Sequence, residues 1–131
     1  MHYLVMLEDD LDRIRRFNAI VATHHPGVRI DVCRPAPAFI AAYSTLTSTP
    51  CLICLDHDLF VDSPDDPDPG DGRDVSTFLA AQDAICPVLI HSTNAPAADS
   101  MILSMRAGWA IELLRSVMTG SNHTGILMLA K

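Results

Sequence analysis

Three short polar segments carry residue types that bind metals and transfer protons. Each directly follows an apolar run: residues 8–10 are Glu-Asp-Asp, residues 56–58 are Asp-His-Asp, and residues 91–94 are His-Ser-Thr-Asn. Carboxylate oxygens suit Mg²⁺ and Mn²⁺, which keep positions open for water and phosphate oxygens. Imidazole can donate and accept protons near neutral pH. The three segments together therefore predict a metal-dependent site for phosphate chemistry, if the fold brings them to one place.

The carboxylates are the candidate metal ligands. We expect Glu8, Asp9 and Asp56 to hold a divalent cation, either Mg²⁺ or Mn²⁺. Asp58 would complete the metal shell or orient a neighbouring histidine. Asp10 is equally well placed to cap the helix that follows it, and the same structural role is open to Glu8 and Asp9.

The two histidines are candidates for the acid and the base of phosphodiester cleavage. We expect the carboxylates near His57 and His91 to favour the protonated imidazole. Two other roles stay open for each of them, namely metal ligation or a purely structural hydrogen bond to the backbone. Ser92 and Asn94 offer donors that would orient a phosphate, although the same residue types also build ordinary turns.

Apolar periodicity supplies the elements that must position these residues. The pattern predicts strands near residues 3–7, 28–33, 51–55, 87–90 and 109–114, and helices near residues 10–25, 38–46, 75–79 and 98–106. Strands that alternate with helices indicate βαβ units, and hence a doubly wound parallel α/β sheet with helices in layers on both faces. Ligands of such sheets bind at the carboxyl ends of the strands, where the three polar segments fall.

Residues 60–73 are expected to form a long acidic loop, because prolines, glycines and aspartates there can neither bury themselves nor continue a helix or strand. A calcium loop of the EF-hand type is the alternative, but Thr77 stands where that loop needs a bidentate Glu. Asp74 is expected to cap the next helix. Residues 116–131 fit either a short helix or a strand.

Composition excludes several classes of protein. The chain has 131 residues and a formal net charge of −7, which suits a single domain over residues 1–131 and opposes unaided binding to duplex DNA or to an anionic membrane. No apolar stretch is long enough to span a membrane, and the N-terminus lacks the pattern of a signal peptide, so we expect a cytoplasmic protein. The four cysteines are expected to be reduced thiols.

The strand ends resemble those of response-regulator receiver domains. Receivers have an acidic pair after the first strand, an Asp after the third and a hydroxyl residue near the end of the fourth, and these residues bind Mg²⁺, accept phosphate and sense it. The resemblance implies that Glu8 and Asp9 are metal ligands and that Asp56 is the acceptor. Receivers also have a Lys after the fifth strand, and here the chain departs from their pattern. Its only lysine is Lys131, and Arg115 lies nearest the place of the receiver Lys.

A closer resemblance is to the receiver-like family named for predicted processing of cyclic phosphates. Its signature segments are matched in order by residues 7–10 (Leu-Glu-Asp-Asp), 55–59 (Leu-Asp-His-Asp-Leu), 72–75 (Gly-Arg-Asp-Val) and 91–94 (His-Ser-Thr-Asn). The resemblance covers roughly residues 4 to 105 and implies a receiver or flavodoxin-like fold with about five strands in the order 2-1-3-4-5.

These observations lead to a first functional hypothesis. It is a metal-dependent phosphoesterase that processes a cyclic or terminal phosphate of a nucleotide, another small molecule or an RNA end. In this hypothesis His57, His91 and Asp56 are catalytic, and Ser92 and Asn94 bind the phosphate. The alternative is a signal-transduction module in which Asp56 is phosphorylated, or in which the pocket only senses a phosphate ligand. A structural adaptor without chemistry is the third possibility.

Overall fold

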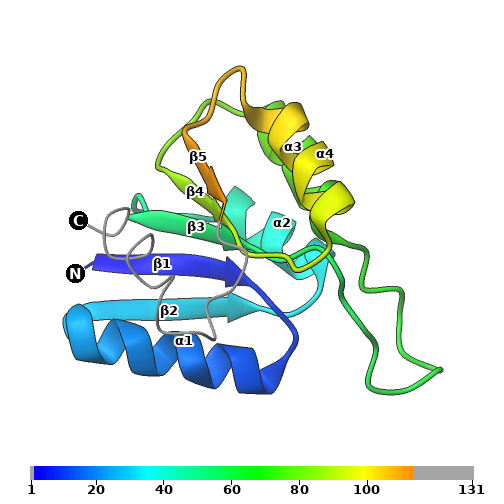
Figure 1. Cartoon of the computed structure of the whole chain (residues 1–131), viewed down its shortest axis with the longest axis horizontal. Coiled ribbons are helices and arrows are strands. Elements are labelled where there is room, and N and C mark those ends of the chain that lie inside the picture. The colour runs from blue at the N-terminus through cyan, green and yellow to red at the C-terminus, as the bar shows by residue number, and fades with distance from the viewer. Residues whose placement is uncertain (1, 114–131) are drawn as a thin grey trace.

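A five-stranded parallel sheet forms the centre of the molecule and carries helices on both faces (Figure 1). The computed structural model describes residues 2–113. The elements are β1 (His2–Leu7), α1 (Leu11–His24), β2 (Val28–Cys33), α2 (Ala36–Ser44), β3 (Leu52–Leu55), α3 (Gly72–Ala80), β4 (Val88–Ile90), α4 (Ala95–Met105) and β5 (Ile111–Leu113). The strand order is β2-β1-β3-β4-β5 and every pair is parallel, which confirms the predicted fold class and order. The predictions for residues 114–131, including Arg115 and the tail, lie outside the described residues.

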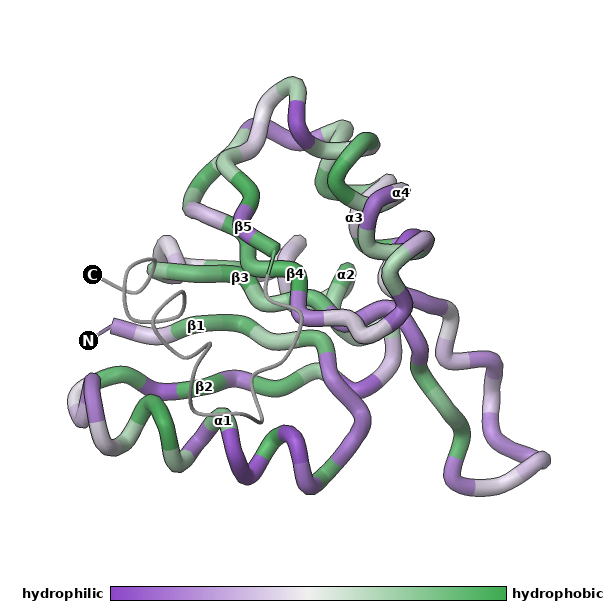
Figure 2. Tube along the Cα trace, in the orientation of Figure 1, coloured by the Kyte–Doolittle hydropathy of each residue, from purple (hydrophilic) through white to green (hydrophobic). Residues whose placement is uncertain are grey.

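The central strands are apolar on both sides because both faces of the sheet are covered. All four residues of β3 are buried, as are the last five of β1. On one face α1 packs Phe17 and Val21 against the sheet. On the other face α2, α3 and α4 contribute Phe39, Leu79 and Met101. Figure 2 shows this distribution, with hydrophobic central strands and a largely hydrophilic outer side of α1.

Two helices begin earlier than the sequence pattern predicted. α2 starts at Ala36 instead of residue 38, and α4 starts at Ala95 instead of residue 98. Both helices have a proline in the first turn, where the missing N–H costs no helical hydrogen bond. The prolines therefore belong to the helices and do not precede them.

α3 also begins earlier, and its N-cap is Asp71 rather than the predicted Asp74. Asp71 Oδ1 accepts a hydrogen bond from the backbone N–H of Asp74 at 3.0 Å, and Asp74 Oδ2 accepts one from the backbone N–H of Asp71 at 3.0 Å. This reciprocal pair is a capping box, which satisfies two N–H groups at the start of the helix. The acidic loop consequently ends at Asp71 and not at residue 73.

β5 begins later than predicted, at Ile111 rather than at residue 109. Trp109 instead turns its side chain into the core, where its indole N–H donates to the carbonyl of Leu79 at 2.9 Å. A buried indole needs such an acceptor, and this one lies at the C-terminal end of α3.

The loop between β3 and α3 projects from the body of the molecule (Figure 1). Two of its carboxylates are bonded to its own backbone: Asp66 Oδ2 accepts from Ser63 N at 2.9 Å, and Asp68 Oδ1 accepts from Gly70 N at 2.9 Å. They therefore serve the loop conformation and do not converge as calcium ligands. None of the helices in residues 2–113 has both the length and the apolar character needed to cross a membrane.

Candidate metal and phosphate site

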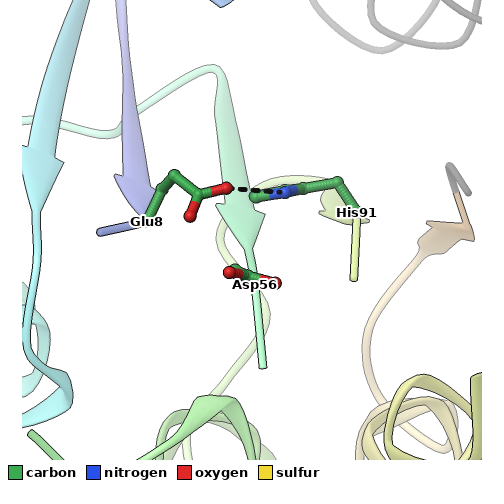
Figure 3. Close-up of side chains that lie close together, drawn as sticks. All are labelled: Glu8, Asp56 and His91. Atoms are coloured by element: carbon green, nitrogen blue, oxygen red, sulfur yellow. Dashed lines mark ion pairs between the residues drawn. The ribbon is translucent and has the colours of Figure 1, made fainter. Parts of the chain in front are cut away.

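The carboxyl ends of β1, β3 and β4 bring Glu8, Asp56 and His91 together (Figure 3). The strand register aligns the last residues of these three strands, so the residue that follows each strand lies at the same level of the sheet. One ligand atom from each side chain lies within 4.8 Å of the other two. The relative exposures of the three residues are 0, 1 and 2%. We call this group the carboxylate–histidine cluster.

Several buried polar atoms of the carboxylate–histidine cluster have no hydrogen-bond partner. They are Glu8 Oε1, Asp56 Oδ2 and both ring nitrogens of His91. The second oxygen of Glu8 is anchored, because it accepts the backbone N–H groups of Asp9 at 3.0 Å and Asp10 at 3.2 Å. Each unpaired buried polar atom costs about 1–3 kcal/mol, so the arrangement is suited to a ligand. Two carboxylates and an imidazole are a donor set for a divalent cation.

Burial controls the protonation of the cluster. Burial and the nearby charge of Asp56 raise the pKa of Glu8 to about 8, and burial also raises the pKa of Asp56. Burial, aided by the charge of Arg13, lowers the pKa of His91 to about 3. The expectation that the carboxylates would favour protonated His91 is therefore wrong, because desolvation outweighs their attraction. A neutral imidazole has a lone pair for a metal but no second proton to donate.

Arg13 is a site residue that the sequence reasoning did not single out. Its Nη1 lies 3.4 Å from Glu8 Oε1 and 3.7 Å from Asp56 Oδ2. Asp10 caps α1 by accepting the backbone N–H groups of Asp12 and Arg13, so the cap role left open for Asp10 is the one observed. The sequence position of Arg13 could have revealed it, because the first turn of a helix that follows a strand lies over the end of that strand.

His57 and Asp58 belong to a neighbouring group. The Nδ1 atom of His57 lies 2.8 Å from Asp58 Oδ1, and Asn94 Nδ2 donates to the same oxygen at 3.3 Å. The His57 hydrogen bond lowers the pKa of Asp58. On the other side of the ring, Nε2 lies 3.7 Å from Asp71 Oδ2. Asp58 thus orients His57 and is not part of the carboxylate–histidine cluster, and no contact found among the described residues joins His57 to the imidazole of that cluster.

The remaining predicted site residues have structural partners. Asp9 Oδ2 accepts the backbone N–H of Phe60 at 2.6 Å, which ties the start of the acidic loop to the strand end. Ser92 Oγ accepts the backbone N–H of Asn94 at 3.0 Å. Asn94 Oδ1 accepts the N–H of Ala97 at 3.2 Å and caps α4. Phosphate binding by Ser92 and Asn94 remains a prediction, as does metal ligation by Asp9.

Gly72 lets α3 approach the site closely. Its backbone N–H donates to the carbonyl of His57 at 2.9 Å. A Cβ atom at this position would overlap the backbone oxygen of Asp56 and would lie 2.8 Å from both His57 Cα and Met101 Cε. The helix start therefore supports the backbone that presents Asp56 and His57.

The fold and the acidic strand ends together define a receiver domain. The sequence matches the family described as "Cyclic-phosphate processing Receiver domain" over residues 3–107, and the chain belongs to that family. The resemblance seen in the sequence is thereby confirmed. A search among curated proteins found no match.

Solved structures of response regulators share the fold. The Mn²⁺-bound form of response regulator Rcp1 aligns with a TM-score of 0.71 and 20% identity, covering 98% of this chain and 91% of that chain. A receiver domain from Rhodospirillum rubrum gives a TM-score of 0.69 and 17% identity, with coverages of 98% and 90%. The phosphorylated cyanobacterial phytochrome response regulator RcpA gives 0.64 and 23%, with coverages of 100% and 90%.

Proposed function

We propose that this receiver domain binds a divalent cation at Glu8, Asp56 and His91, and that the cation-loaded site takes a phosphoryl group onto Asp56. The observation that carries the proposal is the convergence of three buried side chains whose inward atoms lack hydrogen-bond partners. The cation would neutralise the carboxylates and offer positions to phosphate oxygens. The Mn²⁺ and Mg²⁺ named for the structural relatives Rcp1 and TrrA are consistent with such an ion.

The donor set favours Mn²⁺ over Mg²⁺. Mg²⁺ takes oxygen ligands almost entirely, whereas an imidazole suits the transition metals better. Because His91 supplies a neutral nitrogen beside two carboxylates, we expect Mn²⁺ to bind more tightly than Mg²⁺.

Phosphorylation of Asp56 would use a carboxylate oxygen as the nucleophile. That oxygen would attack the phosphorus of a small phosphodonor, forming an acyl phosphate while the bond from phosphorus to the donor oxygen breaks. The position of Asp56 directly after the central strand β3 supports this role. The domain would then act as a signalling module whose ligand is a small phosphate-containing molecule.

Acetyl phosphate tests the proposal. With Mn²⁺ present, we expect the intact protein to gain the mass of one phosphoryl group, and Asp56→Asn to gain none. Asp65→Asn, which changes an exposed loop carboxylate, is the matched control and should be modified normally. A protein that binds Mn²⁺ but gains no adduct would contradict the acceptor role of Asp56 and leave the cation site standing.

Processing of cyclic phosphates is the second candidate, favoured by the oriented His57 and by the name of the family. His91 is a poor proton donor in this structure. His57, oriented by Asp58, would therefore have to act as both the acid and the base. An RNA terminus or a nucleotide would be the ligand. Divalent-cation-dependent hydrolysis of a 2′,3′-cyclic nucleotide that is lost in His57→Ala would favour this enzyme, and hydrolysis that survives in His57→Ala would exclude the role.

A further inference from the structure

We propose that Arg13 is the anion-binding residue of this site and that it exchanges partners. Without a cation its guanidinium pairs with the carboxylates of Glu8 and Asp56, and with a cation bound it turns to the phosphoryl group. This inference rests on the proposed cation site and assigns to it a coupling between cation and phosphate.

The observed pairing of Arg13 is loose. Its Nη1 is buried and lies 3.4 Å from Glu8 Oε1 and 3.7 Å from Asp56 Oδ2, but it has no hydrogen-bond partner. Charge-assisted hydrogen bonds between a guanidinium and a carboxylate are typically about 2.7–2.9 Å long. The guanidinium therefore faces both carboxyl groups of the cluster without a hydrogen bond to either, and its Nε also lies 3.6 Å from Oδ2 of Asp10, the N-cap of the same helix. The side chain is 24% exposed, so it reaches from the buried cluster to the surface of the site.

A divalent cation bound to the same oxygens would remove the electrostatic attraction that holds Arg13 beside them. It would neutralise Glu8 and Asp56 and, at this short range, repel the guanidinium. A phosphoryl group bound beside the cation is the nearest new source of negative charge. The planar guanidinium, with its fork of donors, matches phosphate oxygens well.

Three other arginines near this end of the sheet have partners outside the carboxylate–histidine cluster. On the same helix, Arg15 and Arg16 pair with Asp12 at 3.2 and 3.0 Å on the exposed side. Arg34 pairs with Asp62 of the acidic loop at 3.2 Å and donates to the backbone carbonyl of Asp9 at 3.4 Å. The only lysine of the sequence is its last residue. Arg13 is thus the basic side chain that contacts the carboxylate–histidine cluster.

The exchange makes the two binding events cooperative. Cation binding frees Arg13 for the anion, and anion binding keeps Arg13 from competing with the cation. By linkage, phosphate strengthens cation binding by the same factor by which the cation strengthens phosphate binding. Removal of the guanidinium takes away its share of the coupling and leaves only the part due to direct contact between phosphate and cation, yet it also removes the competitor for the cation. A residue with a merely structural role would instead weaken both events together.

The test is a calorimetric titration of the full chain with Mn²⁺, with and without inorganic phosphate. We expect phosphate to strengthen Mn²⁺ binding by roughly five-fold or more in the unmodified protein. Arg13→Gln should bind Mn²⁺ at least as tightly as the unmodified protein in the absence of phosphate, and phosphate should strengthen that binding by a smaller factor than in the unmodified protein. Arg16→Gln is the matched control, because it removes an exposed arginine one turn further along the same helix. It should keep the full coupling.

Each other result overturns the inference. Coupling of the same strength in Arg13→Gln shows that Arg13 does not bind the anion. Weaker Mn²⁺ binding in Arg13→Gln together with a lower melting temperature shows a structural role. Mn²⁺ binding without coupling in the unmodified protein removes the inference but leaves the cation site, whereas failure of that protein to bind Mn²⁺ overturns the proposed function as well.

Discussion

At the scale of single residues, burial separates side chains that look equivalent in the sequence. Asp56 and Asp58 flank the same histidine, yet Asp56 is 1% exposed in the carboxylate–histidine cluster while Asp58 orients His57 near the surface. The sequence indicated that both follow a buried strand, but strand alternation ends at Leu55 and cannot say which carboxylate turns inward. Arg13 was missed for a related reason, because the side of a helix that faces a site depends on how the helix packs.

The burial of His91 predicts that it serves as a ligand and not as an acid. Its low pKa keeps the imidazole neutral, and neither ring nitrogen has a hydrogen-bond partner, although Nδ1 lies 3.7 Å from Glu8 Oε1. His91→Gln should therefore weaken Mn²⁺ binding by at least about tenfold, because even the mutation of a residue that only hydrogen-bonds to a metal ligand typically lowers metal affinity by that factor. Calorimetric titration measures the change.

His57→Gln is the matched control for this substitution, because it alters the histidine that lies outside the carboxylate–histidine cluster. It should leave Mn²⁺ affinity unchanged. Equal losses in the two variants would mean that both imidazoles reach the cation, and an unchanged affinity in His91→Gln would remove His91 from the ligand set.

At the scale of elements, the presence and order of the strands were predictable, whereas the starts of three helices and of β5 were not. Buried parallel strands are short apolar runs, and β1 and β3 each end where acidic residues begin. Helix starts depend on the first turn, in which proline is tolerated and in which an aspartate can accept a hydrogen bond from the N-cap residue. Asp74 illustrates this point, since it is the third residue of α3 and bonds back to its cap, Asp71.

The close approach of α3 to the site makes Gly72 a test of how this helix supports the carboxylate–histidine cluster. Gly72→Ala should lower the free energy of unfolding by about 1–3 kcal/mol, because the added methyl group meets the backbone of Asp56 and His57. It should also weaken Mn²⁺ binding, since Asp56 must shift to make room. Urea denaturation and calorimetric titration measure the two effects.

Gly108→Ala is the matched control for the added methyl group. A Cβ atom at Gly108 would meet nothing within 4 Å, and its φ is not positive. Its unfolding free energy and Mn²⁺ affinity should both stay near those of the unmodified protein. If Gly72→Ala were equally harmless, α3 could retreat without cost and would not hold the site backbone in place.

At the scale of the whole molecule, the acidic residues that give the chain its net charge of −7 are of two kinds. The carboxylates of Glu8 and Asp56 are buried, with raised pKa values and unpaired atoms, so they gain from a cation. Those of the acidic loop are exposed or bonded to loop N–H groups. Composition alone predicted metal binding, but only the fold tells which acids are involved.

This division predicts which carboxylates carry the stabilisation by a cation. At a free Mn²⁺ concentration of 100 times the dissociation constant, the ion should stabilise the protein by about 2.7 kcal/mol and raise its melting temperature by several degrees. Glu8→Gln should abolish the rise, whereas the double change Asp65→Asn and Asp66→Asn, which removes the same kind of charge from the loop, should retain it. Thermal unfolding in Mn²⁺ and in chelator measures the effect. A rise that disappears in the loop variant and persists in Glu8→Gln would move the cation from the end of the sheet to the acidic loop, because stabilisation follows the ligands that bind the folded state.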